Sequence, residues 1–565
     1  MSTSEHVSTK HSNGNKKARR PSLPKKKLLL VSPDSGTIST ERLYFAPPLG
    51  VMRLTGYLNS YGHEAEYYDP NLYACNEKGP SLAEKLQEKE WDIIGFSVLD
   101  ETLIQDIQNM YTAREMQPEA LVIAGGIEAQ FNYQTLLDKT PCRIVILGEG
   151  EVPLRMLADG EPWEKIPGIV IKNLAEVLSE ELFNEATQLI PWEDINYEEY
   201  WDVYMDIYRD QWSEEVASQI KTVRIFSRNR CPIGCKYCSS TFQLTLASGG
   251  KVPVISSTEE NLINVVDRVV KSHPDVRMIY LTDDDFVINK LSVIKFCKQV
   301  IERDFGDLRF MCFARITDLT EEVIQWMSKA NFRRLNIGVE SFSQAVLDEV
   351  GKRCDATRIH TTLKLLKQYG VGPYCNIILT TPNSTLEDVE MTLDGILEYI
   401  TDDFYQAGII PAIYPLKGTE FFETQWDFKS HITEIPGTQF TLRRDDYIYA
   451  ENPLTREFQV RYIEGVDAAV EKYIEEYDVR HASSANLAVM KCRFAKRLID
   501  EIRKEAEQGK VSWTEHITPG AGRNYSDKAA SQTEYASERP SDQDLLSDLG
   551  PVAGNPGDST KHMLV

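Results

Sequence analysis

Residues 27–173 alternate between short, continuous apolar runs and longer segments whose apolar positions lie three and four residues apart. Continuous runs are typical of strands in a parallel sheet that helices cover on both faces, and the longer spacing is typical of amphipathic helices. The pattern predicts a doubly wound α/β domain, whose ligand would lie beyond the carboxyl ends of its strands. The predicted strands are Lys27–Val31, Glu64–Tyr68, Asp92–Val98, Ala120–Ala124 and Arg143–Leu147. The predicted helices are Leu49–Ser60, Ser81–Glu90 and Leu103–Met116.

Only Glu64–Tyr68 departs from this pattern, because its polar and apolar residues alternate, and we expect it to be an edge strand.

A second series of strand and helix patterns begins at residue 221. Six strand–helix units in a row predict a (β/α)6 partial barrel, with its loops gathered at one mouth. The predicted strands are Thr222–Ser227, Met278–Leu281, Arg309–Phe313, Arg334–Val339, Tyr374–Leu379 and Tyr405–Ile413. The predicted helices include Glu260–Ser272, Leu291–Arg303, Glu321–Lys329 and Asp355–Gln368.

The patterns divide the chain into an α/β protein of three domains with a bridging segment and two tails. The predicted order is a disordered basic tail (1–26), a Rossmann-like domain (27–173), a bridging segment (174–220), the partial barrel (221–425), a helical domain (426–515) and a disordered polar tail (516–565). Within the helical domain the clearest amphipathic patterns are Leu454–Tyr477 and Ala485–Gln508.

Charge and hydropathy exclude several classes of partner. The net charge of −24 argues against general nucleic-acid binding and against docking on an anionic membrane, because both need a basic surface. No apolar run is long enough to cross a bilayer, and the N-terminus has no apolar signal core. We therefore expect a cytoplasmic protein that acts on neither nucleic acids nor membranes.

Three of the ten cysteines, Cys231, Cys235 and Cys238, form a group on the loop where the first barrel strand ends. A closed structural zinc site needs a fourth ligand, and the nearest histidine, His273, lies far along the chain. Three thiolates and one vacancy suit a 4Fe–4S cluster in which one iron binds a substrate. The alternatives are a zinc site completed by a distant residue and three thiols that lie together by chance. Seven cysteines are isolated, and Cys312 is typical of those that act as small hydrophobic residues in strands.

The spacing Cys-x3-Cys-x2-Cys, with Tyr237 before the third cysteine, resembles the signature of the radical S-adenosylmethionine (SAM) superfamily. The resemblance implies a 4Fe–4S cluster whose open iron chelates SAM, and reductive cleavage of SAM to a 5′-deoxyadenosyl radical. It further implies SAM contacts after successive barrel strands. These are Tyr237 on the cysteine loop, Asp283 and Asp285 after the second strand, Arg315 after the third, Glu340 and Ser341 after the fourth, and Asn376 and Thr380 on the fifth. At Asn376 and Thr380 the chain departs from the family, which has glycines there.

The N-terminal domain resembles the cobalamin-binding domain of one radical SAM subgroup. The matching stretches include Pro47–Gly50, Ile94–Ser97, Gly125-Gly126 and Gly148–Glu151. The resemblance implies that cobalamin lies against Ser32, Ser97, Gly125, Gly126, Gly148 and Glu149. The loop Ser32–Gly36 lacks the histidine that ligates cobalt in other cobalamin domains, so no protein imidazole is expected below the cobalt. The same absence fits a domain that has lost cobalamin.

The resemblance implies a methyltransferase that moves a methyl group from methylcobalamin to an unactivated carbon by means of the 5′-deoxyadenosyl radical. Its partners would be a small-molecule or peptide substrate and a flavodoxin or ferredoxin as reductant. The alternatives are a cobalamin-linked rearrangement or cyclisation, and a non-catalytic cobalamin or iron–sulfur sensor. A methylthiotransferase is disfavoured, because those relatives carry further cluster cysteines in the N-terminal domain, where this chain has only Cys75 and Cys142.

Overall fold

The computed structural model describes residues 25–35, 46–73, 79–169, 180–208, 220–240, 254–399, 404–424, 426–434, 441–476 and 484–510. The two predicted disordered tails lie outside these residues, except for positions 25 and 26, and Gly36 and Cys75 lie outside them as well. No described helix has the length and apolar character needed to span a membrane.

The N-terminal domain contains a five-stranded parallel sheet in the order β2-β1-β3-β4-β5. Its strands are β1 (Lys27–Val31), β2 (Glu64–Tyr68), β3 (Ile93–Ser97), β4 (Leu121–Gly125) and β5 (Ile144–Val145). Its helices are α1 (Leu49–Ser60), α2 (Leu82–Gln87), α3 (Leu103–Met116), α4 (Ile127–Lys139) and α5 (Glu151–Ala158). The predicted doubly wound domain is confirmed, and β2 is an edge strand as expected.

The continuous apolar runs have a direct structural cause. Along β1, Leu29 and Val31 pack into the core on the face covered by α2 and α3, while Leu28 and Leu30 pack into the core on the face covered by α1 and α5. Because successive side chains of a strand point to opposite faces, a sheet with helices on both sides buries every residue of such a run.

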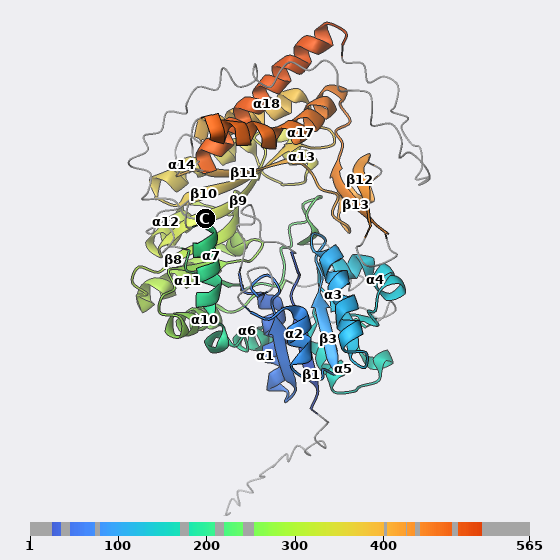
Figure 1. Ribbon diagram of the computed structural model, residues 1–565. Helices are drawn as coiled ribbons and strands as arrows, with labels where there is room; N and C mark the ends of the chain where they lie inside the picture. Colours follow the sequence, from blue (N-terminus) through green and yellow to red (C-terminus); the bar gives the residue numbers. More distant parts are fainter. Residues whose placement is uncertain are drawn as a thin grey trace, which may run out of the picture.

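The bridging segment is helical and contacts both of its neighbours. It contains α6 (Glu180–Gln188), the 3-10 turn η2 (Trp192–Asp194) and α7 (Tyr197–Tyr208), after the short turn η1 (Trp163–Lys165). Trp192 and Trp201 are buried in the barrel core. Tyr200, on another face of α7, donates a hydrogen bond of 3.0 Å to Asp69 at the end of β2. Figure 1 shows α7 between the two sheets.

The second domain is the predicted partial barrel, with six parallel strands in the order β11-β10-β9-β8-β7-β6. Its strands are β6 (Thr222–Ile225), β7 (Met278–Leu281), β8 (Arg309–Arg315), β9 (Phe332–Glu340), β10 (Gly372–Thr380) and β11 (Gln406–Ala412). Its helices are α10 (Glu259–Ser272), α11 (Lys290–Arg303), α12 (Glu321–Lys329), α13 (Gln344–Glu349), α14 (Ala356–Gln368) and α15 (Leu386–Tyr399), with the turn η3 (Phe286–Ile288). The spatial order of the strands follows the sequence, as one-directional winding requires.

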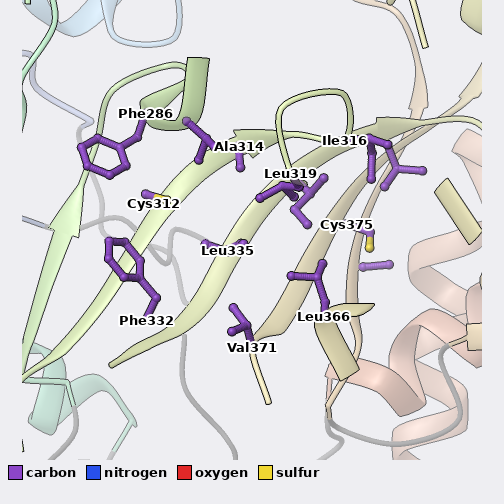
Figure 2. Close-up of a cluster of buried hydrophobic side chains, with 14 of the residues drawn as sticks. Phe286, Cys312, Ala314, Ile316, Leu319, Phe332, Leu335, Leu366, Val371 and Cys375 are labelled. Atoms are coloured by element: carbon purple, nitrogen blue, oxygen red, sulfur yellow. The ribbon is translucent and has the colours of Figure 1, made fainter. Parts of the chain in front are cut away.

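The barrel core lies between the sheet and its outer helices. Figure 2 shows Phe286, Phe332 and Leu335 in this layer, with Cys312 and Cys375 among them. Cys312 is fully buried among apolar neighbours, so it acts as a small hydrophobic residue, as expected.

The C-terminal domain contains two helices and a hairpin. The long helices α17 (Pro453–Glu476) and α18 (Ser484–Glu507) match the predicted pair and contact β11, the open edge of the barrel sheet (Figure 1). The short helix α16 (Glu420–Glu423) precedes an antiparallel hairpin of β12 (Phe428–Glu434) and β13 (Thr441–Ile448). The hairpin corrects the expectation of helices alone. Its first strand carries Lys, Ser, His and Glu among few apolar residues, so no alternating apolar signal marks it.

Candidate functional site

The carboxyl ends of the two sheets face one another. Glu128, directly after β4, pairs at 2.9 Å with Lys417, which lies on the loop after β11. At a second point, Val152 after β5 and Phe226 after β6 belong to one small apolar cluster with Phe183 of the bridging segment. Loops at the carboxyl ends of parallel strands form the ligand sites of both fold types, so the two sites open toward each other.

The cysteine loop is fastened to the neighbouring strand by Asp283, at the end of β7. Its carboxylate accepts hydrogen bonds from the backbone N–H and the hydroxyl of Ser227 and from the backbone N–H of Arg228, at 2.7, 2.6 and 2.7 Å. Burial raises the pKa of Asp283, and these hydrogen bonds oppose the shift. Asp283 therefore anchors the base of the loop that carries Cys231, Cys235 and Cys238, in place of the SAM contact that the sequence suggested.

Burial disfavours ionisation of the three thiols of this loop. It raises the pKa of Cys231 to about 11 and that of Cys238 to about 12, and the charge of Cys235 adds to both shifts. Burial also raises the pKa of Cys235. Across the described ranges, no three cysteine, histidine or acidic side chains are gathered closely enough to hold a metal ion as they stand. Because a bound metal deprotonates cysteine ligands and draws them together, the donor set of three cysteines within eight residues fits a three-thiolate cluster.

Asp285, after β7, and Arg315, at the end of β8, each have a buried polar atom without a hydrogen-bond partner among the described residues. Asp285 is 1% exposed, and its Oδ2 has no hydrogen-bond partner among the described residues. Burial, and secondarily the charge of Asp318, raises the pKa of Asp285 to about 7. Arg315 contacts Asp318 at 3.3 Å and the carbonyl oxygen of Lys352 at 3.0 Å, and its Nε has no described partner. An unsatisfied acid beside an unsatisfied guanidinium fits the amino and carboxylate groups of SAM.

Glu340 and Tyr237 belong to a buried polar group next to Cys235. Glu340 ends β9 with φ of +65°, a left-handed conformation that is uncommon for a residue other than glycine. Its Oε1 accepts a hydrogen bond of 2.6 Å from Nζ of Lys352. Burial, followed by the charge of Glu340 and a hydrogen bond to it, raises the pKa of Tyr237. The predicted residues Tyr237 and Glu340 thus come together, with Lys352 as a third member that no sequence motif indicated.

Two predicted SAM contacts point elsewhere. Ser341 is fully buried, and its hydroxyl lies 2.6 Å from that of Thr392 on α15. Thr380 is fully buried as well, accepts a hydrogen bond of 3.1 Å from Gln459 on α17 and donates one of 2.7 Å to Pro411. Their hydroxyls are engaged by helices that pack against the barrel, so the structure does not bring them to the cysteine loop.

Asn376, the remaining predicted SAM contact, is half-buried on β10. It is in register with Gly338 of β9 and Gly408 of β11. Asn376 thus lies between glycines of the two adjacent strands.

The predicted cobalamin residues gather at the carboxyl edge of the N-terminal sheet. Ser97 and Gly125 end β3 and β4, and Gly126, Gly148 and Glu149 lie after β4 and β5; the three strands are neighbours in the sheet. Gly126 has φ of +96°, and an added Cβ would lie 2.9 Å from the backbone of Val98. Packing of the turn itself therefore requires a glycine at residue 126, whereas Gly125 and Gly148 leave this edge partly free of side chains, which fits the approach of a flat, bulky ligand.

Ser32 is the exception in this set. It is buried, and its hydroxyl donates a hydrogen bond of 3.0 Å to Asp69. Further along the same loop, Asp34 accepts a hydrogen bond of 2.7 Å from Asn109. Both side chains thus serve the internal hydrogen-bond network of the loop after β1.

Two family models match the chain in the order that the structure displays. Residues 37–158 match the B12 binding domain, and residues 225–396 match the radical SAM superfamily. Similarity over almost the whole chain is found with the radical SAM methyltransferase TsrM from Kitasatospora setae, at a TM-score of 0.60 and 14% identity over 86% of this chain and all of that one. TsrM with cobalamin and a [4Fe-4S] cluster bound gives a TM-score of 0.56.

The chain belongs to the cobalamin-dependent radical SAM family. Its cofactors are a 4Fe–4S cluster, SAM and cobalamin, and the structure has a domain for cobalamin and a barrel for the other two.

Curated relatives of this family member carry different names. An anaerobic magnesium-protoporphyrin IX monomethyl ester cyclase of Rubrivivax gelatinosus is 25% identical over 65% of this chain and 64% of the relative. An uncharacterised methyltransferase of Pyrococcus horikoshii is 22% identical over 70% of this chain and 82% of the relative. The alignment with the cyclase spans less than two thirds of that protein.

Proposed function

We propose that this enzyme is a C-methyltransferase that acts on a small-molecule or peptide substrate held between its two domains. The observation that carries the proposal is the meeting of the two carboxyl edges, marked by the contact of Glu128 with Lys417. A substrate there would lie within reach of both cofactor sites. When bound, the cluster and SAM supply a radical that removes hydrogen from the substrate, and cobalamin supplies a methyl group.

The protein residues would orient these groups and exclude water. Cys231, Cys235 and Cys238 are the proposed cluster ligands, on a loop that Asp283 holds to β7. Asp285 and Arg315 are the proposed contacts for the amino acid part of SAM, because each keeps a buried atom that no described residue satisfies. Ser97, Gly125, Gly126, Gly148 and Glu149 are the proposed cobalamin contacts. A flavodoxin or ferredoxin is the proposed reductant.

Transfer of the methyl group is favoured by the loop after β1. Its described part, Ser32–Ser35, contains no histidine, and the side chains of Ser32 and Asp34 are hydrogen-bonded within the domain. Bound cobalamin would therefore receive no imidazole from this part of the loop, and the cofactor itself would supply the methyl group. The methyltransferase among the relatives agrees with this assignment.

Methyl transfer from SAM to cobalamin can be tested without knowing the substrate. Anaerobically reconstituted protein with reduced cobalamin is mixed with SAM whose methyl group is deuterated. A methyltransferase should form trideuterated methylcobalamin and one S-adenosylhomocysteine per cobalamin, as measured by mass spectrometry. Trideuterated methylcobalamin should be absent from a Gly126→Leu variant, because a large side chain at this turn would meet the backbone of Val98.

The second candidate is a ring closure, which the similarity to the cyclase favours. Cobalamin and iron in the protein, together with 5′-deoxyadenosine but neither labelled methylcobalamin nor S-adenosylhomocysteine, would support this candidate and reject methyl transfer. Absence of iron from the reconstituted protein would reject both.

A further inference from the structure

Lys352 is a buried cation in the wall of the cluster site. Its side chain is 8% exposed, and its Nζ lies 2.6 Å from Oε1 of Glu340. A buried ammonium group persists in a folded protein only when a partner compensates for its lost hydration, and Glu340 is that partner. Glu340, which makes this pair, has a left-handed backbone conformation that is uncommon for a residue other than glycine.

The turn that carries Lys352 is attached to the cysteine loop. The backbone N–H of Lys236, next to Cys235, donates a hydrogen bond of 3.1 Å to the carbonyl oxygen of Val350. Arg315 donates one of 3.0 Å to the carbonyl oxygen of Lys352 itself. The position of Lys352 is therefore fixed relative to the loop by backbone contacts as well as by its ion pair.

The space for the ion pair exists because residue 338 is glycine. A Cβ at this position would overlap both Nζ of Lys352 and Oε1 of Glu340. The ion pair lies beside the cysteine loop, because the turn that carries Lys352 is hydrogen-bonded to residue 236, directly after Cys235.

We propose that Lys352 is a positioning residue for the cluster, whose fixed positive charge beside Cys235 makes the reduction of the cluster easier. Reduction adds one electron, supplied by the one-electron reductant, and neither forms nor breaks a bond. A nearby cation stabilises the additional negative charge, and the charges and hydrogen bonds around an iron–sulfur cluster set its potential. Glu340 holds the cation in place. This inference rests on the proposed ligation of the cluster by Cys231, Cys235 and Cys238.

The test is the midpoint potential of the reconstituted cluster without SAM, measured by a redox titration followed by electron paramagnetic resonance, with iron content measured in parallel. Lys352→Met removes the charge and keeps the length of the side chain, Lys352→Arg keeps the charge, and Glu340→Gln removes the negative partner. Lys364→Met, at an exposed position of α14, is the control.

Lys352→Met should shift the midpoint potential to more negative values, and Glu340→Gln should shift it to less negative values. Lys352→Arg and Lys364→Met should keep the wild-type potential. An unchanged potential in Lys352→Met, or shifts of the same sign in the two charge-removing variants, would overturn the proposal. Loss of iron from both of those variants but not from Lys364→Met would also overturn it, because Lys352 would then be structural. Absence of iron from the wild-type protein would instead reject the proposed function.

Discussion

Asp283, at the end of β7, accepts hydrogen bonds from both the backbone N–H and the hydroxyl of Ser227, at the end of β6. The contact joins the acidic turn after the second barrel strand to the first residue of the segment that leads to Cys231. Because Asp283 is 2% exposed and uses both of its oxygens, the base of the cysteine loop is fixed before any cofactor binds.

Replacement of Asp283 should therefore weaken the cluster loop. An asparagine side chain at this position would have one acceptor oxygen and a donor amide that would face backbone N–H groups. We expect Asp283→Asn to lower the free energy of unfolding by about 1.5–3 kcal/mol, the usual cost of a lost hydrogen bond to a charged group, and to reduce iron retention. Denaturant unfolding and iron analysis measure both effects. Asp307→Asn, at an exposed position, is the control, and equal iron retention in the two variants would contradict the anchoring role.

Asp285 should make the stability of the iron-free protein depend on pH. Its pKa is raised to about 7, mainly by burial, whereas an unfolded aspartate titrates near about 3.9. Between these values only the folded protein binds the proton, so stability is highest at the acidic end and falls as the pH rises toward 7. From pH 5 to pH 7 the wild type should lose about 2–3 kcal/mol relative to Asp285→Asn. Urea unfolding at several pH values checks this, and parallel pH profiles for the two proteins would rule it out.

Gly338 should tolerate no side chain. An alanine methyl group would overlap the pair of Lys352 and Glu340, and overpacking of a buried site costs about 1–3 kcal/mol. Gly338→Ala should lower the melting temperature. Gly50→Ala, in the first turn of α1, is the matched control, because no atom lies within 4 Å of its added methyl group. Its melting temperature should stay the same or rise, and an unchanged value for Gly338→Ala would show that the pair can move aside.

Removal of Lys417 should destabilise the contact between the domains. Glu128 has only 5% of its side chain exposed, so loss of Lys417 removes the positive charge paired with this buried carboxylate and leaves it with hydrogen bonds such as that from Asn132. Since Lys417 is itself 29% exposed, we expect Lys417→Met to cost about 1–3 kcal/mol, less than the loss of a fully buried pair. The same substitution should cost little in a Glu128→Gln background. A double-mutant cycle of unfolding free energies measures this coupling, and additive effects would mean that the pair contributes nothing.

Much of the fold follows from local patterns. The bounds of β1, β2, α1 and α3 agree with the predicted ranges, because each is marked by an unbroken apolar run or by a regular spacing of apolar residues. The hairpin of β12 and β13 was missed because its polar first strand has little apolar periodicity. Lys352 was missed for a different reason, since a lone lysine after a glycine resembles any solvated surface residue until its burial is known.

The sequence by itself determined the order of the domains, the strand that carries the cysteines and the donor chemistry of the loop. These features depend on the spacing of apolar residues and cysteines within short segments, which can be read from the sequence alone. Only the tertiary structure decided which polar groups remain open. Hydrogen bonds join Asp283 to Ser227, Ser341 to Thr392 and Thr380 to Gln459. By contrast, Asp285 and Arg315 each keep a buried polar atom without a hydrogen-bond partner among the described residues. Hydrogen bonds are short-range, and the partners come from segments that lie far apart in sequence, so their pairing exists only once folding has brought those segments together.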